Sequence, residues 1–312
     1  MALVVSREET EKLIDMPAAL GVIEQMFRDR AAGKLTSVAR QRISGSDKKL
    51  NFMAAWHRES DLICLRAYAG PSNTITLYDG ATGQTLAVFN ANYLSALRTG
   101  AASGVAAKFL APERSRRAGL IGAGRQAFFQ VEALYHSNGV NDVIIYSRNP
   151  ERRQRFISEM TRTLPLKFTV ASSIEDVEAE ADILVVATDS TVPVVNGTAL
   201  KNPCLVISMG ANQPVKHEVS GSLLELMDAV VVDDLATAKI DSGDLIDACA
   251  AGLLRWDRMI ALERLVSGDE ANPRGGRVLF KSHGIADEDL AVASYIWQRA
   301  RQKINAREVP EI

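Results

Sequence analysis

The sequence predicts an α/β protein in which a doubly wound parallel sheet of the Rossmann type is joined to a smaller α+β domain. Strands and helices alternate from residue 117 to about residue 234, and each crossover between parallel strands has to be long enough to hold a helix. A separate run of short strands, from residue 38 to residue 90, precedes this region. A chain of 312 residues is too long for one compact core and fits two domains of ordinary size.

The N-terminal third predicts two helices followed by an antiparallel sheet. Ser6 and Glu9 have the spacing of a capping box, and Asp15 with Pro17 starts a second helix that ends at Gly33. The strands that follow read "ARQRI", "LNFMAAW", "LICLRAYA", "TITLYD" and "TLAVFN", with "DGATG" as a hairpin turn. Residues 91–110 are dense in small residues at helical spacing, which predicts a closely packed helix that leads into the second domain.

The middle of the chain predicts the parallel sheet and its helices. In order, the segments are "AGLIG", "AFFQVEALYH", "DVIIYS", "PERRQRFISEMTRT", "KFTV", "SIEDVEAE", "DILVVAT", "CLVISMG", "SGSLLELM" and "AVVVDD". Internal repeats and low-complexity segments are absent from the sequence.

The composition narrows the class of protein. A hydrophobic share of 47%, a charged share of 24% and a formal net charge of −2 are typical of a globular protein, and they argue against a nucleic-acid partner. No apolar run approaches the roughly 18 to 20 residues that span a bilayer, and the N-terminus turns acidic early, so we expect no membrane partner and a cytoplasmic location. Cys64, Cys204 and Cys249 lie far apart, which favours reduced packing residues over a disulfide framework or a metal site.

The stretch "GLIGAGRQAFF" has the pattern of a dinucleotide-binding turn. Gly122 permits a tight turn after the strand, Gly124 lets the backbone approach a pyrophosphate, and Ala127 is a small residue where strand and helix pack. By itself this pattern is often only a tight turn. Its place between a strand and a helix, inside a long alternating region, favours a dinucleotide whose phosphates face the start of the helix.

The end of the second strand of this region indicates which dinucleotide is bound. An NAD site usually has an acid about 20 residues beyond the glycines, whereas this chain has Ser147 and Arg148. Arg148, with Arg152 or Arg153 one helical turn later, suits the 2′-phosphate of NADP(H), which we therefore favour over NAD(H). The alternative is that Arg152 and Arg153 form a solvated helix face and only Arg148 matters.

Several motifs together resemble the ornithine cyclodeaminase/mu-crystallin family. They are "LRTGAASGVAAKFLA" at 97–111, "GAGRQA" at 122–127, "SMGANQPVKHE" at 208–218, "SGDL" at 242–245 and "FKSHGIADEDLAVA" at 280–293. The resemblance implies an NAD(P)-binding Rossmann domain over residues 113–287. It also implies a substrate-binding and dimerisation domain over residues 1–112, completed by a C-terminal helix over residues 288–312, and a homodimer formed through the sheet of that domain.

The resemblance also implies residues for two parts of a site. Arg40, Arg66 and Arg98 match the basic residues that hold the substrate carboxylate, although Arg66 replaces an expected lysine, and Arg42 is an open candidate for a fourth cation. Any of these arginines has the alternative of a structural salt bridge. The positions implied to bind the cofactor are Thr74, Gly122, Gly124, Arg125, Gln126, Ser147, Arg148, Thr188, Met209, Gly210, Ala211, Lys216 and Ser282. Thr188 as a turn residue and Lys216 as a solvated lysine are the alternatives there.

Two departures from the family pattern concern catalysis. Asn212 and Asn51 stand where cyclodeaminases of the family have carboxylates. Cyclodeamination needs a general acid/base at the reacting carbon, which an asparagine cannot be, but Asn212 can still orient an imine nitrogen. His283 occupies a position that is often apolar in the family, so we predict that it donates a proton, the alternative being a cap or packing residue.

These observations predict an NAD(P)H-dependent oxidoreductase that acts on the C–N bond of a small amino or imino acid, either an imine reductase or an amino-acid dehydrogenase. Asn212 and His283 are its expected catalytic residues, and no metal is expected. The alternatives are an ornithine cyclodeaminase and a mu-crystallin-like NADPH-binding protein with little turnover. The substrate side chain stays open, because many arginines favour a dicarboxylic imine but a salt bridge accounts for an extra arginine equally well.

Overall fold

The computed structural model describes residues 2–45, 47–303 and 308–309, and it divides into two compact units. The first unit runs from the N-terminus through Arg98 and resumes at Gly284, and the second unit comprises Thr99–His283. The sequence placed these boundaries after residues 112 and 287, but the first falls inside helix α3 (Ala91–Leu110). The reason is local, because Arg98 bonds to residues of the first unit while Gly100 abuts Phe129 of the second.

The sheet of the first unit has the strand order β15-β1-β6-β5-β4-β3-β2. Its strands are β1 (Ala2–Val5), β2 (Leu35–Ser44), β3 (Lys49–His57), β4 (Leu62–Ala69), β5 (Ser72–Asp79), β6 (Thr85–Asn90) and β15 (Glu308–Val309). Strands β2 to β6 pair antiparallel to their neighbours, as the alternating pattern predicts. The sequence analysis missed β1, a short apolar segment that pairs parallel to β6.

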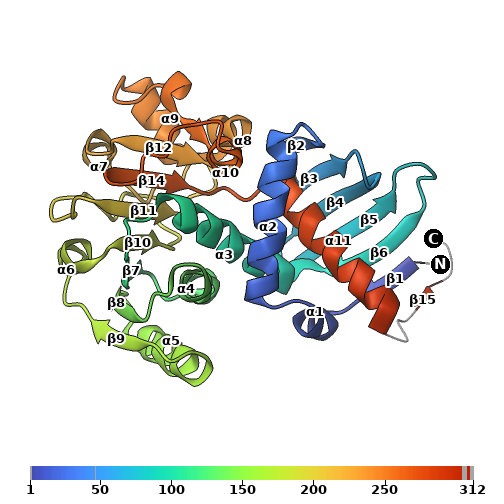
Figure 1. The fold of residues 1–312 in the computed structure, drawn as a ribbon, viewed down its shortest axis with the longest axis horizontal. Coiled ribbons are helices and arrows are strands. Elements are labelled where there is room, and N and C mark those ends of the chain that lie inside the picture. Colours follow the sequence, from blue (N-terminus) through green and yellow to red (C-terminus); the bar gives the residue numbers. More distant parts are fainter. Residues whose placement is uncertain (1, 46, 304–307, 310–312) are drawn as a thin grey trace. The chain divides into compact units, whose positions relative to one another are not determined.

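Helices cover one face of this sheet (Figure 1). Helix α1 (Arg7–Leu13) begins with the predicted capping box of Ser6 and Glu9, and α2 (Met16–Ala31) begins at the predicted cap Asp15. Helix α11 (Ala286–Lys303) packs against α2 and against β2 to β5. Met53 and Phe89 are among the apolar side chains that the strands bury on this face.

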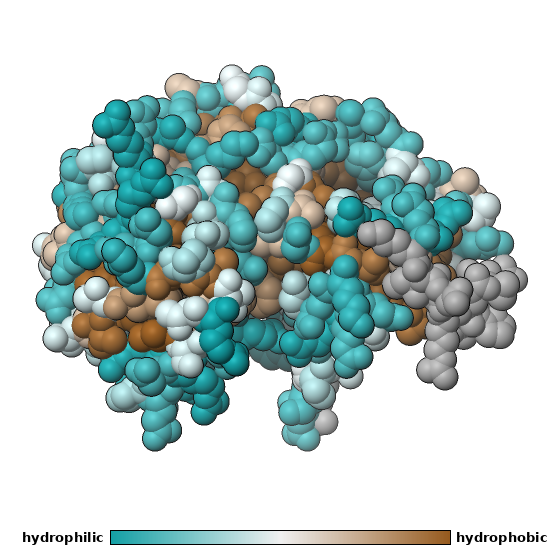
Figure 2. Space-filling model, turned by 60° about the horizontal axis from the view of Figure 1, so that its bottom comes forward, coloured by the Kyte–Doolittle hydropathy of each residue, from teal (hydrophilic) through white to brown (hydrophobic). Residues whose placement is uncertain are grey.

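The opposite face of the sheet exposes apolar side chains. Val4, Val38, Ile43 and Leu50 are 40% to 57% exposed and lie on β1, β2 and β3. Because side chains alternate along a strand, the register places these four on the face that Met53 does not share. Figure 2 shows apolar residues exposed between hydrophilic ones on one side of the molecule.

The second unit is built on a wholly parallel sheet with the order β13-β12-β14-β11-β10-β7-β8-β9 and helices on both faces (Figure 1). This is the doubly wound fold that the sequence predicts. Its strands are β7 (Arg117–Ile121), β8 (Asp142–Tyr146), β9 (Lys167–Val170), β10 (Ile183–Val186), β11 (Cys204–Ser208), β12 (Ala229–Val232), β13 (Ile260–Ala261) and β14 (Arg277–Lys281). Its helices after α3 are α4 (Arg125–Asn138), α5 (Pro150–Thr163), α6 (Ile174–Glu180), α7 (Gly221–Glu225), α8 (Leu235–Asp241), α9 (Gly243–Ala250), η1 (Trp256–Arg258) and α10 (Leu262–Ser267).

The order of the strands creates a switch point beside β7. The chain leaves β7 toward β8 and β9 on one side, and then returns to β10 on the other side. In an open parallel sheet, the crevice at the carboxyl ends of two such strands is where ligands bind. The carboxyl ends of β7 and β10 therefore mark the expected binding position.

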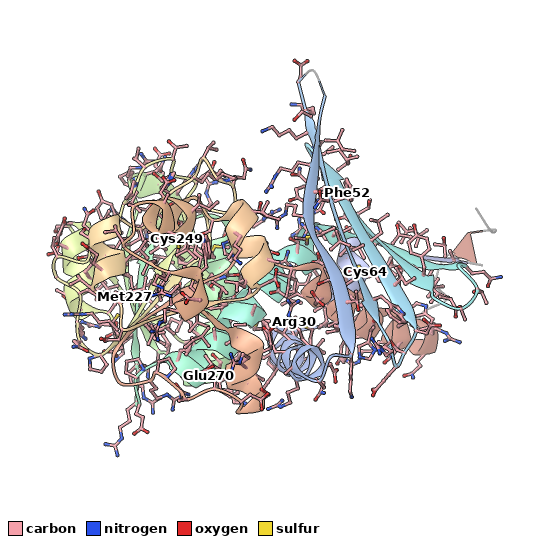
Figure 3. All side chains as sticks on the ribbon, turned by 90° about the horizontal axis from the view of Figure 1, so that it is seen from above. Arg30, Phe52, Cys64, Met227, Cys249 and Glu270 are labelled. Carbon is pink, nitrogen blue, oxygen red and sulfur yellow. The ribbon has the colours of Figure 1, made fainter. Side chains whose placement is uncertain are left out.

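The three cysteines are free, as predicted. Cys64 lies in the sheet of the first unit and Cys249 lies in α9 (Figure 3). Cys204 is buried in β11. Burial raises the pKa of the Cys204 thiol to about 12, so this side chain acts as a small apolar residue.

Within the residues that the structure describes, no helix combines the length and the apolar character needed to cross a bilayer.

An added methyl group should have opposite effects on the free energy of unfolding at two helix glycines. A Cβ at Gly100 would lie 2.4 Å from the carbonyl oxygen of Phe129, whereas a Cβ at Gly21 in α2 has nothing within 4 Å. We expect Gly100→Ala to lower the free energy of unfolding by about 1 to 3 kcal/mol through overpacking. Gly21→Ala, the matched control, should raise it by up to about 1 kcal/mol because alanine favours the helix. Urea unfolding followed by circular dichroism measures both, and equal effects would contradict the close packing of α3 on α4.

Candidate active site

A cavity of about 740 Å³ opens at the switch point of the second unit. It lies at the ends of β7, β8, β10 and β11, as expected for a ligand site in this fold. Ten of the thirteen residues implied to bind a cofactor line it: Gly122, Gly124, Arg125, Gln126, Ser147, Arg148, Thr188, Met209, Gly210 and Lys216. Asn212 lines it as well.

Three of the implied cofactor residues are not among those that line this cavity. Ala211 and Ser282 are buried in the second unit, and Thr74 lies on β5 of the first unit. The structure therefore does not place these three residues at the cavity of the second unit.

The turn after β7 has the geometry of a phosphate cradle. Gly122 has φ +102°, and a Cβ there would lie 2.4 Å from the carbonyl oxygen of Ala187, so only glycine fits. Gly124 is the N-cap of α4 without a side-chain capping bond, and a Cβ at Gly124 would have nothing within 4 Å. The helix therefore presents its first N–H groups to the cavity. Beside them, the buried Oε1 of Gln126 has no hydrogen-bond partner within the described residues.

The end of β8 brings two arginines to the same cavity. Arg148 and Arg152 are exposed and line it, while the Nη1 of Arg153 donates to the carbonyl oxygen of Ser147 at 3.3 Å. Asn149 fixes this segment, because its Oδ1 accepts the N–H of Arg152 at 2.8 Å and caps α5. Of the two arginines left open by the sequence, Arg152 is the one that lines the cavity.

Lys216 is held at the cavity by an ion pair with Asp189. Asp189 is the one carboxylate among the described residues that line the cavity. The cations Arg125, Arg148 and Arg152 outnumber it, so the cavity suits an anionic ligand.

A buried glutamate that sequence reasoning missed organises the ends of β10 and β11. Glu218 accepts the N–H of Thr188 at 2.7 Å and its hydroxyl at 2.9 Å. The same carboxylate accepts the Ser208 hydroxyl at 2.7 Å and the N–H of Gly210 at 2.8 Å. These four hydrogen bonds to one carboxylate hold Thr188 and Gly210 in place, although both residues lie beyond the ends of the strands. The glutamate closes the motif "SMGANQPVKHE", which was its only signal.

A buried ion pair between Asp244 and Lys281 helps to hold Glu218 in position. Asp244, in the motif "SGDL", accepts the N–H of Glu218 at 2.8 Å and the Nζ of Lys281 at 2.6 Å. Lys281 also donates to the Ser208 hydroxyl at 2.7 Å, and all of these side chains are buried. The "SGDL" motif therefore fixes the loops around the cavity.

His283 follows β14 and is bonded to a buried carboxylate. Its Nδ1 lies 3.0 Å from Oδ1 of Asp233, and its backbone N–H donates to Oδ2 of the same carboxylate at 2.6 Å. The hydroxyl of Ser282 reaches the same carboxylate at 3.3 Å. A carboxylate on Nδ1 places the ring proton on that nitrogen when the imidazole is neutral, which leaves Nε2 to exchange a proton. Asp233 had no role in the sequence analysis.

The three arginines implied to bind the substrate carboxylate lie together in the first unit. Arg40 (β2), Arg66 (β4) and Arg98 (α3) are all buried, with exposures of 3% to 6%. Met53 pairs with Arg66 in register, and the register of β2 shifts by one residue between Val38 and Gln41, which flanks Arg40. This bulge sets the face on which Arg40 lies.

Three buried carboxylates from the first turn of α11 pair with arginines. Arg98 donates from Nε to Asp289 at 2.9 Å and from Nη1 to Glu288 at 2.8 Å. Arg66 donates to Asp289 at 3.3 Å, and Arg30 of α2, labelled in Figure 3, donates to Asp287 at 2.9 Å. Salt bridges therefore account for part of the arginine content, which is the alternative that the sequence left open. The acids stand in "GIADEDLAVA", but only the fold reveals their partners.

Arg66 is constrained on three sides. Its Nη2 donates to the Ser95 hydroxyl at 2.9 Å, its Nε donates to Asn73 at 3.2 Å, and its guanidinium lies 4.9 Å from the ring centroid of Tyr68. Burial lowers the pKa of Arg66, and the adjacent Asp289 opposes this shift. A lysine could not make these contacts with its single ammonium group.

The remaining polar candidates of the first unit are near this cluster in register. Arg42 is half-buried on β2, two residues beyond Arg40, and pairs in register with Asn51 of β3. Asn51 is bonded locally, with its Nδ2 3.5 Å from the carbonyl oxygen of Lys49. Neither contact assigns a role to these two residues.

Comparison with known proteins gives a match along nearly the whole chain. The model of the ornithine cyclodeaminase/mu-crystallin family matches residues 1–304. An iminosuccinate reductase of Paracoccus denitrificans is 32% identical, over 98% of this chain and 99% of that protein. An alanine dehydrogenase of Archaeoglobus fulgidus is 30% identical, over 96% of each chain.

Solved structures show the same fold. The Delta(1)-pyrroline-2-carboxylate reductase of Thermococcus litoralis, in complex with NADH and L-proline, superposes with a TM-score of 0.93 at 28% identity, covering 98% of this chain and 100% of that one. The iminosuccinate reductase of Paracoccus denitrificans, in complex with NAD+, superposes with a TM-score of 0.92 at 29% identity, covering 99% of both chains.

Replacing the buried Glu218 by its amide should loosen the cavity. In Glu218→Gln the Nε2 group would face N–H and O–H donors, so we expect the free energy of unfolding to fall by at least about 1.5 kcal/mol and dinucleotide affinity to fall with it. The exposed Glu225 in the next helix provides the control Glu225→Gln, which should change neither quantity. Calorimetric unfolding and fluorescence titration measure the two effects. A Glu218→Gln protein that matches the control would show that the four donors do not depend on the negative charge.

Proposed function

Because this chain belongs to the ornithine cyclodeaminase/mu-crystallin family and is an NAD(P)-dependent oxidoreductase of the C–N bond of small amino or imino acids, we propose that it serves as an NADPH-dependent 2-imino-acid reductase. The observation that favours a reductase over a cyclodeaminase is Asn212, an amide that lines the cavity where a cyclodeaminase needs a carboxylate. The reverse reaction, oxidation of the amino acid, uses the same groups.

The cavity of the second unit suits the dinucleotide. The backbone between Gly122 and Gly124 and the first turn of α4 hold the pyrophosphate, with Arg125 beside it. Arg148 and Arg152 bind the 2′-phosphate, which an acid at this position would repel. When bound, the nicotinamide ring supplies the hydride that reduces the imine carbon.

The remaining roles belong to this chain's own side chains. The arginine cluster of Arg40, Arg66 and Arg98 binds the substrate carboxylate. Asn212 accepts a hydrogen bond from the substrate nitrogen through its Oδ1 and so orients the C=N bond. His283 delivers a proton from Nε2 to the nitrogen, and Asp233 holds the ring by Nδ1. The imine gains one hydride and one proton and leaves as the amine.

We also propose a homodimer that forms through the open sheet face of the first unit. The exposed side chains of Val4, Val38, Ile43 and Leu50 give this face the apolar character of an interface. Sedimentation at the mass of two chains would support it, and Val38→Glu should then shift the protein toward the monomer.

The cytoplasmic location stays a prediction of the sequence.

One assay separates the reductase from its alternatives. Purified protein is mixed with NADPH and either a cyclic imino acid or a 2-oxo acid with ammonia, and the loss of NADPH absorbance is followed. The proposed function requires NADPH consumption that depends on the imino acid. Release of ammonia from ornithine without net cofactor consumption would instead identify a cyclodeaminase, and tight NADPH binding without turnover would identify a binding protein.

Arg148 should set the choice of cofactor. We expect Arg148→Ala to weaken NADPH binding by about 1.5 to 3 kcal/mol, which is the usual contribution of hydrogen bonds to a charged group, and to leave NADH binding nearly unchanged. Arg155→Ala on the following helix α5 is the control, because Arg155 is exposed and is not among the residues that line the cavity. Isothermal titration with both cofactors measures the effect. An equal loss for NADPH and NADH would contradict the role of Arg148.

His283 should contribute to the rate of reduction. A general acid typically contributes about 10²- to 10⁴-fold, so we expect His283→Val to slow single-turnover reduction of the imine by at least about 100-fold while keeping the fold. NADPH absorbance and circular dichroism measure the rate and the fold. An unchanged rate would mean that the imine arrives already protonated and that His283 is a packing residue.

A further inference from the structure

We propose that the buried carboxylate of Glu218 favours the oxidised, positively charged form of the nicotinamide ring and so makes bound NADPH a better hydride donor. This inference rests on the proposed function, because it concerns the cofactor of the same cavity. It adds a role in the energetics of hydride transfer to the structural role of Glu218 at the ends of β10 and β11.

The cavity has two sides, which divide the proposed dinucleotide between them. Arg148 and Arg152 line it after β8, whereas Thr188, Gly210 and Asn212 line it after β10 and β11. A 2′-phosphate on the two arginines puts the adenosine half at β8, and the pyrophosphate takes the turn after β7. The side at β10 and β11 is then left for the nicotinamide half, together with the amide proposed to orient the imine.

Glu218 lies directly behind that second side of the cavity. Its side chain is fully buried, and its Oε1 accepts the N–H and the hydroxyl of Thr188 at 2.7 Å and 2.9 Å. Its Oε2 accepts the N–H of Gly210 at 2.8 Å, and a Cβ at Gly210 would lie 2.4 Å from Oε1. At Gly210, therefore, only one layer of backbone separates the carboxylate from the cavity.

The hydrogen bonds around Glu218 have the pattern of an ionised carboxylate. Lys281 donates to the Ser208 hydroxyl at 2.7 Å, so the proton of that hydroxyl points to Oε2 of Glu218, 2.7 Å away. With the backbone donors, both oxygens of the carboxylate act as acceptors. Lys281 contacts Glu218 through Ser208, while its direct ion pair is with Asp244 at 2.6 Å. Glu218 is therefore a buried negative charge at this side of the cavity.

A charge at this place acts differently on the two forms of the cofactor. Loss of a hydride turns the neutral dihydronicotinamide ring into a ring with one positive charge. A buried negative charge attracts the charged ring more than the neutral one, and the attraction is stronger in a protein than in water. Glu218 therefore stabilises the oxidised form relative to the reduced form. In the proposed direction, this favours transfer of the hydride to the imine carbon, while the nitrogen takes up the proton.

The test is the ratio of the dissociation constants of NADP+ and NADPH, measured by isothermal titration in the parent protein and in Glu218→Gln. The amide removes the charge at nearly constant size, so we expect Kd(NADP+)/Kd(NADPH) to rise by about tenfold, or about 1.4 kcal/mol. Weaker binding of both forms, through lost hydrogen bonds, cancels in this ratio. An unchanged ratio in a folded Glu218→Gln protein would overturn the inference.

Thr188→Val is the matched control, because it removes one donor to the same carboxylate and leaves the charge in place. It should keep the ratio of the parent, even if it weakens both forms. A shift as large as that of Glu218→Gln would show that disturbance of the cavity sets the ratio, and the inference would fail.

The parent protein decides the question if Glu218→Gln does not fold. The inference then requires NADP+ to bind at least as tightly as NADPH, and tenfold tighter binding of NADPH would contradict it. These titrations contain no imine, so a protein without reductase activity still gives the ratio. Failure of the proposed function appears separately, in the assay of NADPH consumption.

Discussion

The pairing of buried arginines with the carboxylates of α11 is the interaction on which the first unit depends. A guanidinium that is 3% exposed, such as that of Arg98, is stable there only with an anion in contact. Asp289 and Glu288 provide that anion, and they reach Arg98 only because the C-terminal segment returns to the N-terminal sheet. The arginines that we propose to bind the substrate therefore also hold this unit closed.

The second unit also depends on buried carboxylates, but there they accept hydrogen bonds from irregular backbone. Its cavity needs irregular backbone at the ends of β10 and β11, where strand hydrogen bonds have run out. Glu218 accepts the backbone N–H groups of Thr188 and Gly210 there, Asp244 accepts the N–H of Glu218, and Lys281 pairs with Asp244. Buried carboxylates thus give shape to the cavity, while the exposed arginines Arg148 and Arg152 are left for the ligand.

Local patterns were enough to predict most elements of the fold. The capping box at Ser6, the alternation in β2 to β6 and the glycine turn at Gly122 are encoded by neighbouring residues, and each appears where it was expected. What the sequence did not indicate depends on distant partners. Strand β1 exists because β6 accepts it, and β14 lies between β11 and β12 although it follows both in the chain.

The same distinction holds for the site. Motif and order were enough to bring together most residues at the glycine turn and the strand ends, because ten of the thirteen residues implied to bind a cofactor line the cavity. Glu218, Asp233 and the acids of α11 act on other side chains, so their roles follow only from three-dimensional contacts. A pattern of alternation likewise does not reveal the one-residue shift in β2 near Arg40.

Finally, the second unit is inserted into the first, which has an effect on synthesis at the ribosome. Thr99–His283 is synthesised in full before α11, so the arginines of the first unit meet their carboxylates only after the whole second unit has been made. The N-terminal sheet is therefore translated early but is completed by α11 at a late stage.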